Sequence, residues 1–156
     1  MNFVTPPRYG HAVFCDDVRE EAGNKLSYMG TYRGLLISAT PLPSVLAKFV
    51  VIANFSEPMA DPVMDLTVRI YGPGQEDDDV PLFEMTIPAA DSAKVGLVAD
   101  TPVENQRREL MVPVTFAPFP AAAGKIRVQV IRGDEIHRIG SLLIREPDAP
   151  LSTNAI

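Results

Sequence analysis

The sequence predicts an all-β protein in which antiparallel sheets pack as a β-sandwich. Apolar and polar residues alternate with period two through most of the chain. The 15 prolines and 10 glycines fall mainly between the apolar runs, where turns are expected. No stretch of useful length carries apolar residues at helical spacing. Many short strands separated by turn residues are typical of immunoglobulin-like, Greek-key sandwiches.

The alternation predicts about nine strands and at most one short helical turn. The run from Leu46 to Phe55 is apolar on both faces apart from Lys48, which indicates a central strand. Pro113 lies inside another strand and favours an edge position there, because proline cannot donate to a ladder. The helical turn is expected after Asp16 or Asp17, over residues 18–22. The expected strands are 11–16, 25–32, 34–39, 46–55, 64–71, 80–87, 108–116, 124–132 and 136–145.

The chain is long enough for one ordinary domain, which we place at residues 1–146, followed by a tail at 147–156. Residues 88–107 form a long connection without strong periodicity. The alternating apolar residues predict a core between two sheets. Its expected members are Phe14, Leu26, Phe49, Val51, Leu66, Val68, Ile70, Leu110, Val112, Ile126, Val128 and Leu142.

Charge and composition narrow the classes of partner. The net charge is −6, from 20 acidic and 14 basic residues, which argues against binding to duplex nucleic acid or to anionic membranes. The expected partner is a protein or another copy of the chain. The single Cys15 excludes an intrachain disulfide. With no leader pattern and no long apolar stretch, the expected location is cytoplasmic, or a virion if the protein is phage-encoded.

The adjacent carboxylates of Asp16 and Asp17 are the first candidate site. A catalytic pair must face one substrate, but neighbouring residues point apart on a strand and in a helical turn. We therefore interpret the pair as the corner of a hairpin between strands 11–16 and 25–32. Gly23 and Asn24 would supply positive φ angles, and Lys25 would start the return strand.

A second acidic group, Glu76, Asp77, Asp78 and Asp79, follows a Pro-Gly turn. Loop carboxylates can collect around Ca²⁺, so these residues are weak metal candidates. The run lacks the alternating spacing of a calcium loop, which favours a solvated acidic tip. Cys15 lies in an apolar run and is expected to be buried rather than nucleophilic, with His11 too far along the strand to activate it. We expect no cofactor.

The opening stretch resembles an uncharacterised family of bacterial and phage-encoded proteins. The matching residues are Phe14, Cys15, Asp16 and Asp17, then Lys25, Leu26, Ser27, Gly30 and Tyr32. The later stretch "LTVRIYGPG" and the run from Phe119 to Ile144 are similar as well. Asn24 stands where that family pattern has a second glycine. The resemblance implies a β-sandwich, no known activity and no catalytic residue.

The sequence therefore predicts a non-enzymatic binding or structural module, such as a bacterial or phage accessory or particle protein. The alternative is a Ca²⁺-dependent ligand- or sugar-binding domain, or a hydrolase, that uses Asp16, Asp17 and residues 76–79. Nucleophile, phosphate-binding and metal-binding motifs are missing from the sequence, while the strand pattern is complete. A calcium-dependent rise in melting temperature would favour the alternative.

Overall fold

The computed structural model describes residues 7–92 and 106–148. Within these residues the chain is almost entirely β-structure, with one short helix. The elements are β1 (Tyr9–Cys15), β2 (Asp17–Glu21), β3 (Lys25–Met29), β4 (Leu35–Ile37), β5 (Ser44–Leu46), β6 (Phe49–Pro58), β7 (Leu66–Tyr71), β8 (Phe83–Ile87), α1 (Ala89–Ser92), β9 (Arg107–Phe116), β10 (Phe119–Ala121), β11 (Gly124–Arg132) and β12 (Glu135–Arg145). No helix among the described residues is long and apolar enough to cross a membrane.

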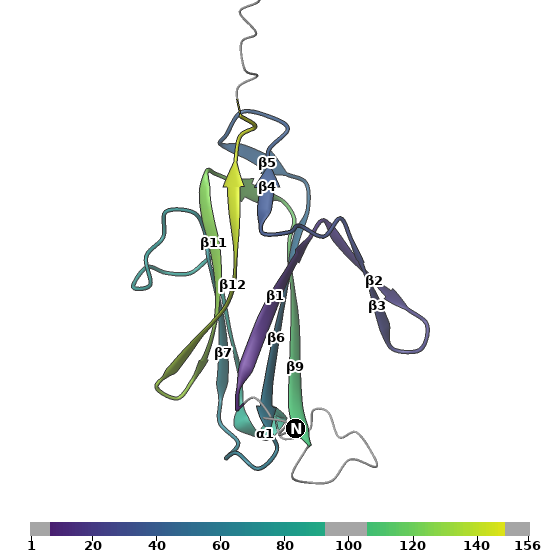
Figure 1. Cartoon of the computed structure of the whole chain (residues 1–156), viewed down its shortest axis with the longest axis vertical. Helices are drawn as coiled ribbons and strands as arrows, with labels where there is room; N and C mark the ends of the chain where they lie inside the picture. Colours follow the sequence, from purple (N-terminus) through teal and green to yellow (C-terminus); the bar gives the residue numbers. More distant parts are fainter. Residues whose placement is uncertain (1–6, 93–105, 149–156) are drawn as a thin grey trace, which may run out of the picture.

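Two sheets form the body of the molecule (Figure 1). One has three strands in the order β1-β6-β9, and the other has five in the order β4-β12-β11-β7-β8. All neighbouring strands are antiparallel except β12 and β4, which run parallel. A two-stranded sheet of β10 and β5 lies at one end of the body, and β2 and β3 form a second two-stranded sheet. The prediction of an all-β protein built from antiparallel sheets is confirmed.

One apolar core joins the two large sheets. It includes Phe49 and Val51 from the three-stranded sheet together with Val68, Ile126 and Val128 from the five-stranded sheet. All the residues predicted for the core are buried in it except two. Leu110 is half-buried against the core, and Leu26 lies on β3, outside the core altogether.

The two sheets approach closely where β1 passes β12. A Cβ built on Gly140 would lie 2.8 Å from the Cβ of Ala12, and one on Gly10 would lie 2.6 Å from the side chain of Ile139. A β-bulge helps to create this contact, because Val128 pairs with Gly140 and Gln129 with Arg138, which leaves Ile139 as the extra residue. Only glycine fits at these two positions without moving a neighbour.

Two predictions about individual strands are confirmed. β6 is the middle strand of its sheet, and almost all of its side chains are buried. Pro113 lies on β9, which is an edge strand, so its missing N–H costs no ladder bond on the open side.

The sequence prediction missed three strands and misplaced one helical turn. β2, β5 and β10 were not expected, and the predicted run 46–55 divides into the end of β5 and most of β6. The residues expected to form a helical turn, 18–22, instead belong largely to β2. The short helix of the structure, α1, begins the segment that we expected to be an irregular connection, and residues 93–105 of that segment lie outside the described residues, as does most of the predicted tail.

The predicted hairpin between strands 11–16 and 25–32 is wrong in its pairing. β1 ends at Cys15 as expected, but it pairs with β6 and not with β3. The chain bends at Asp16 and immediately starts a new strand, β2, which pairs with β3. Val18 is the one apolar residue of β2, too few for the pattern of a buried strand, so the alternation did not reveal β2.

Candidate functional site

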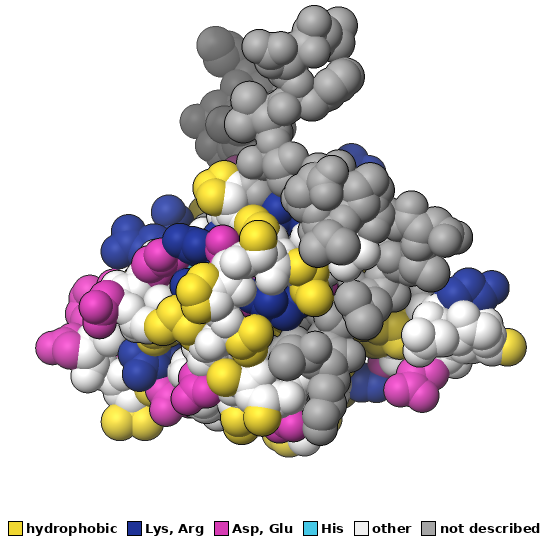
Figure 2. Space-filling view, turned by 90° about the horizontal axis from the view of Figure 1, so that it is seen from below, with side chains coloured by type: hydrophobic (Ala, Val, Ile, Leu, Met, Phe, Trp, Pro, Cys, Tyr) yellow, Lys and Arg dark blue, Asp and Glu magenta, His cyan; other side chains and the backbone are white. Residues whose placement is uncertain are grey.

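The hairpin of residues 17–29, which we call the arm, stands away from the body in Figure 1 and again in the view from below (Figure 2). Its strands pair from Asp17↔Met29 to Glu21↔Lys25. Gly23 and Asn24 turn the chain with φ angles of 80° and 57°. Positive φ at these two residues was predicted, and both fit the left-handed region that Gly and Asn tolerate best.

The base of the arm is fixed by backbone hydrogen bonds. The Asp16 N–H donates to the Met29 carbonyl at 2.9 Å, and the Tyr32 N–H donates to the Phe14 carbonyl at 2.8 Å. These two bonds continue the antiparallel pairing around the bend at Asp16. They hold the arm at a defined position next to β1, although the bend ends the β1 strand.

The two aspartates at this bend have separate partners. The Asp16 carboxylate accepts a hydrogen bond from the Tyr32 hydroxyl and packs against Gly30, whose φ is 66°. The Asp17 carboxylate pairs with the Lys48 ammonium and accepts the N–H of Val18 at 2.8 Å. The two carboxylates thus contact different residues, Tyr32 and Lys48, and they do not face one shared substrate or metal position.

These contacts change two pKa values. The Lys48 ammonium, with help from the Val18 N–H, holds the pKa of Asp17 below its usual value. Burial and the neighbouring Asp16 carboxylate raise the pKa of the Tyr32 hydroxyl. Asp17 is therefore charged at neutral pH, and Tyr32 keeps its proton to donate.

A small apolar cluster lies beside the base of the arm, on the outer face of the three-stranded sheet. Cys15, Val50 and Ile52 are fully buried there, with Val13 and Val18 packed against them. Val18 comes from β2, so the first residues of the arm cover part of this cluster. Cys15 is fully buried, as predicted, and its burial raises the pKa of the thiol and disfavours the thiolate.

A groove of about 490 Å³ separates the outer part of the arm from edge strand β9. Met111 and Pro113 of β9 form one wall, and the arm supplies the other. The Tyr28 hydroxyl reaches across to the Met111 sulfur at 3.7 Å. The arm residues that line the groove are Glu20, Glu21, Asn24, Lys25 and Leu26.

Exposed apolar side chains continue this surface beyond the groove. Tyr28, which contacts Met111, is 39% exposed, and Met111 is 47% exposed. Met29 is 40% exposed and follows Tyr28 on β3, so it projects from the opposite face of the arm. The charged side chains of Glu20, Glu21 and Lys25 line the groove near the tip of the arm. An apolar centre with a polar rim is the usual composition of a surface that contacts another protein.

The acidic loop lies elsewhere, over the outer face of the five-stranded sheet. The Asp77 carboxylate pairs with the Arg127 guanidinium and accepts a 3.1 Å hydrogen bond from the Gln129 amide. The Asp79 carboxylate accepts the N–H of Glu76 at 2.6 Å, and Asp78 is exposed. These carboxylates therefore point to different partners. Among the described residues no group of three or more His, Cys, Asp or Glu side chains is placed to hold a metal ion.

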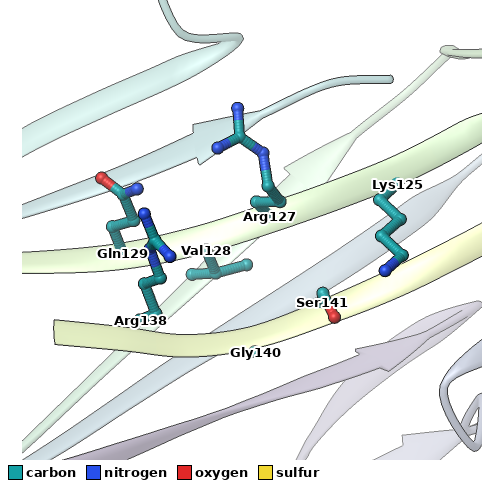
Figure 3. A pocket seen from close by; sticks show the side chains of 7 residues that line it. All are labelled: Lys125, Arg127, Val128, Gln129, Arg138, Gly140 and Ser141. Atoms are coloured by element: carbon teal, nitrogen blue, oxygen red, sulfur yellow. The ribbon is translucent and has the colours of Figure 1, made fainter. Parts of the chain in front are cut away.

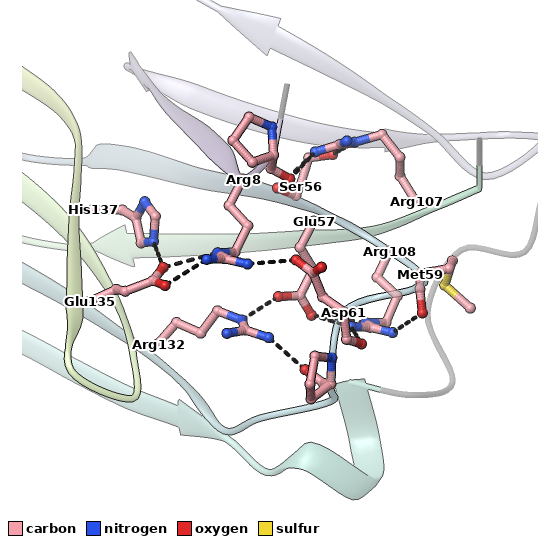
Figure 4. Close-up of polar contacts among 12 residues, drawn as sticks. Arg8, Ser56, Glu57, Met59, Asp61, Arg107, Arg108, Arg132, Glu135 and His137 are labelled. Atoms are coloured by element: carbon pink, nitrogen blue, oxygen red, sulfur yellow. Dashed lines mark hydrogen bonds and ion pairs between the residues drawn. The ribbon is translucent and has the colours of Figure 1, made fainter. Parts of the chain in front are cut away.

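A buried ion network at the end of the body is the main feature that the sequence analysis missed (Figure 4). The Glu57 carboxylate is buried, with the residue 1% exposed. It forms ion pairs with the guanidinium groups of Arg108 at 2.8 Å and Arg132 at 2.7 Å. The same two arginines donate to the carbonyls of Met59, Asp61 and Pro62. Every one of these buried charges is paired, as burial requires.

A second group of charges adjoins this network. Arg8 pairs at 2.6 Å with both Asp61 and Glu135, and His137 contacts Glu135 at 2.8 Å. The Arg8 guanidinium holds the pKa of Glu135 below its usual value. The network joins the segment before β1 to β6, β9, β11 and β12, so its role is to fix the end of the body.

The alternation contained a signal for the buried network. Arg108 has the same parity as Leu110 and Val112 on β9, and Arg132 the same parity as Val128 and Val130 on β11. Each arginine is thus placed on the inward face, where it needs a buried acidic partner.

Comparisons with protein-family models, with curated proteins and with solved structures found no match.

Proposed function

We propose that this protein is a non-catalytic binding module and that the arm and its groove contact another protein. The observation that carries the proposal is the position of the arm. Beyond its base, the hairpin contributes no residue to the core, yet its position is fixed by two backbone bonds and two carboxylate contacts. An isolated two-stranded hairpin is marginally stable in water, so such attachment gives a defined surface to an otherwise weak element.

The chemistry of the surface supports a protein partner. Tyr and Met are enriched at protein interfaces, and Tyr28 and Met111 are exposed where they meet beside the groove, while Met29 is exposed on the other face of the arm. Among the described residues β9 is also an edge strand, and the edge along the groove offers backbone groups to an extended segment. The resemblance to bacterial and phage-encoded proteins is compatible with an accessory protein or a particle component.

We further propose that the body is an immunoglobulin-like, Greek-key β-sandwich. The pairing order supports this assignment: β1-β6-β9 corresponds to strands A, B and E, and β12-β11-β7-β8 corresponds to G, F, C and C′. In that framework the arm is an insertion after the first strand. Because such an insertion leaves the framework intact, it is a position where a contact with another protein is expected.

Site-specific photo-crosslinking tests the proposed surface. A photoreactive amino acid at Tyr28 should join the protein to one partner in an extract of its source cells, whereas the same group at Thr86, exposed on the opposite sheet, should not. The partner should then bind the purified protein, and replacement of Tyr28 and Met29 by alanine should weaken binding at least about tenfold without changing the melting temperature. Equal crosslinking at both positions, or binding that survives the double replacement, would contradict the proposal.

Sedimentation of the purified chain decides whether the partner is another copy. A dimer that dissociates in the Tyr28→Ala, Met29→Ala variant would identify self-association through the arm.

A further inference from the structure

A pocket of about 360 Å³ lies on the outer face of the five-stranded sheet, and the arm belongs to a different sheet (Figure 3). β11 supplies Lys125, Arg127 and Gln129, and β12 supplies Arg138 and Ser141. The first three residues alternate along β11, so all project from the same face. The β-bulge at Ile139 changes the alternation of β12 and brings Arg138 opposite Gln129 on that face.

The pocket is strongly basic in a protein whose net charge is −6. Three cationic side chains line it, and none of its described lining residues is acidic. Lys125 is exposed and has no acidic partner among the described residues, and the Arg138 guanidinium, 78% exposed, makes only a 3.5 Å pair with Asp77. The Asp77 carboxylate therefore pairs with two of the three cations, and Lys125 keeps its charge without an acidic partner in the described part of the chain.

The contacts of Asp77 show that these donors already hold an oxyanion. Its carboxylate pairs with the guanidinium groups of Arg127 and, at 3.5 Å, Arg138. It also accepts a 3.1 Å hydrogen bond from the Gln129 amide. Convergence of these groups lowers the pKa of Asp77, with Arg127 as the main cause. Arg127 is itself held in place by the Gln75 carbonyl and by the ring of Tyr71, 5.1 Å below its guanidinium. The donors are thus pre-arranged, while Lys125 and Ser141 remain available beside them.

We propose that this pocket binds the phosphate group of a small phosphorylated molecule. A phosphate monoester carries close to two negative charges at neutral pH and three strong acceptor oxygens, which match the three cations and the other donors of the lining. Arginine in particular binds such oxyanions through paired N–H donors. The volume accommodates a phosphate with a group the size of a sugar, and no aromatic side chain lines the pocket to stack a nucleobase.

Titration followed by two-dimensional NMR tests the site, since the chain has only 156 residues. The probes are inorganic phosphate, glucose 6-phosphate and glucose. Both phosphate compounds should cause saturable shifts at the amides of residues 125–129 and 138–141, and glucose should cause none. The sugar phosphate should bind more tightly than inorganic phosphate if the ester portion uses the pocket, and equally if only the phosphate is held.

Three single variants test which side chains contribute to phosphate binding. Lys125→Ala and Arg138→Ala should each weaken binding by about tenfold, because each removes a charge-assisted hydrogen bond. Asp77→Asn should strengthen binding, because it removes the competing carboxylate. Lys25→Ala on the arm removes the same charge at a distance and should leave binding unchanged.

Three results would overturn the proposal. The first is the absence of saturable shifts at millimolar phosphate. The second is binding that falls equally in Lys25→Ala and Lys125→Ala, and the third is binding that is unaffected by Asp77→Asn. Each of the last two would indicate general attraction to charge instead of this pocket.

Discussion

The body and the arm are built from the same antiparallel pairing, but only the body has a core behind its strands. β6 is buried on both faces, whereas β2 and β3 have no fully buried side chain. The body therefore gains stability from burial of apolar area, at about 25 cal/mol per Å², and the arm gains little beyond its base. The comparison indicates that the body carries the stability of the protein and that the arm adds little to it.

Replacement of Glu57 should produce the largest loss of stability. Glu57→Gln leaves Arg108 and Arg132 buried without a counter-charge, and removal of one partner from a buried ion pair costs about 3–5 kcal/mol. Urea unfolding followed by circular dichroism measures this change. The matched control is Glu84→Gln, which breaks the exposed pair with Arg69 and should cost less than about 1 kcal/mol. Similar losses in the two variants would show that the network is not important for the body.

One pair of leucine substitutions compares the two regions directly. Leu66, 3% exposed, lies in the core, so Leu66→Ala should cost about 2–5 kcal/mol through lost burial and a cavity. Leu26 lies on the arm and is half-buried, so the same change there should cost about 1 kcal/mol or less. Denaturant melts of both variants supply the two values. A larger loss at Leu26 would mean that the arm supports the body.

A pair of glycines tests how firmly the base of the arm is held. Gly30 and Gly34 have similar φ angles of 66° and 76°, so alanine at either position should cost about 1 kcal/mol from the backbone alone. A Cβ at Gly30 would also lie 2.2 Å from an oxygen of Asp16, whereas nothing lies within 4 Å of one at Gly34. Gly30→Ala should therefore destabilise more than Gly34→Ala. Equal melting temperatures would show that the Asp16 side chain moves away freely.

The sequence predicted the body better than the arm for a physical reason. Alternation reports burial of one face, and the strands around Val68, Val112 and Val128 are buried in this way. β2 has mostly exposed residues, and its pairing depends on the Gly23-Asn24 turn and on contacts at the bend, so its residues alone have no strand periodicity. The ion network depends on which strands become neighbours, and that information lies in the topology of the sheets.

The candidate groove and the outer-face pocket were beyond sequence reasoning for the same reason. The groove brings Leu26 to Met111, and the pocket brings Lys125 to Arg138, from strands whose register was unknown. The residues of the bend, by contrast, were recognised from sequence. Gly23 and Asn24 have the positive φ angles predicted for them, although they close a hairpin of β2 and β3 instead of the expected one.

The smallest expected effect is that of asparagine at the two aspartates of the bend. Asp16→Asn keeps an acceptor for the Tyr32 hydroxyl, so the melting temperature at neutral pH should hardly change. Asp17→Asn loses the exposed pair with Lys48, which predicts a slightly lower melting temperature at neutral pH. The pKa of Asp17 is lower in the folded protein than its ordinary value of 3.8, so its contribution to stability is present above that value and disappears as the pH falls through the folded pKa. Melting temperatures of wild type and Asp17→Asn should therefore differ at pH 7 and converge below the folded pKa. Both variants should keep binding to the partner of the arm, because the carboxylates only hold its base. Loss of that binding in either variant, with melting unchanged, would show that a carboxylate itself contacts the partner and that the bend belongs to the functional surface.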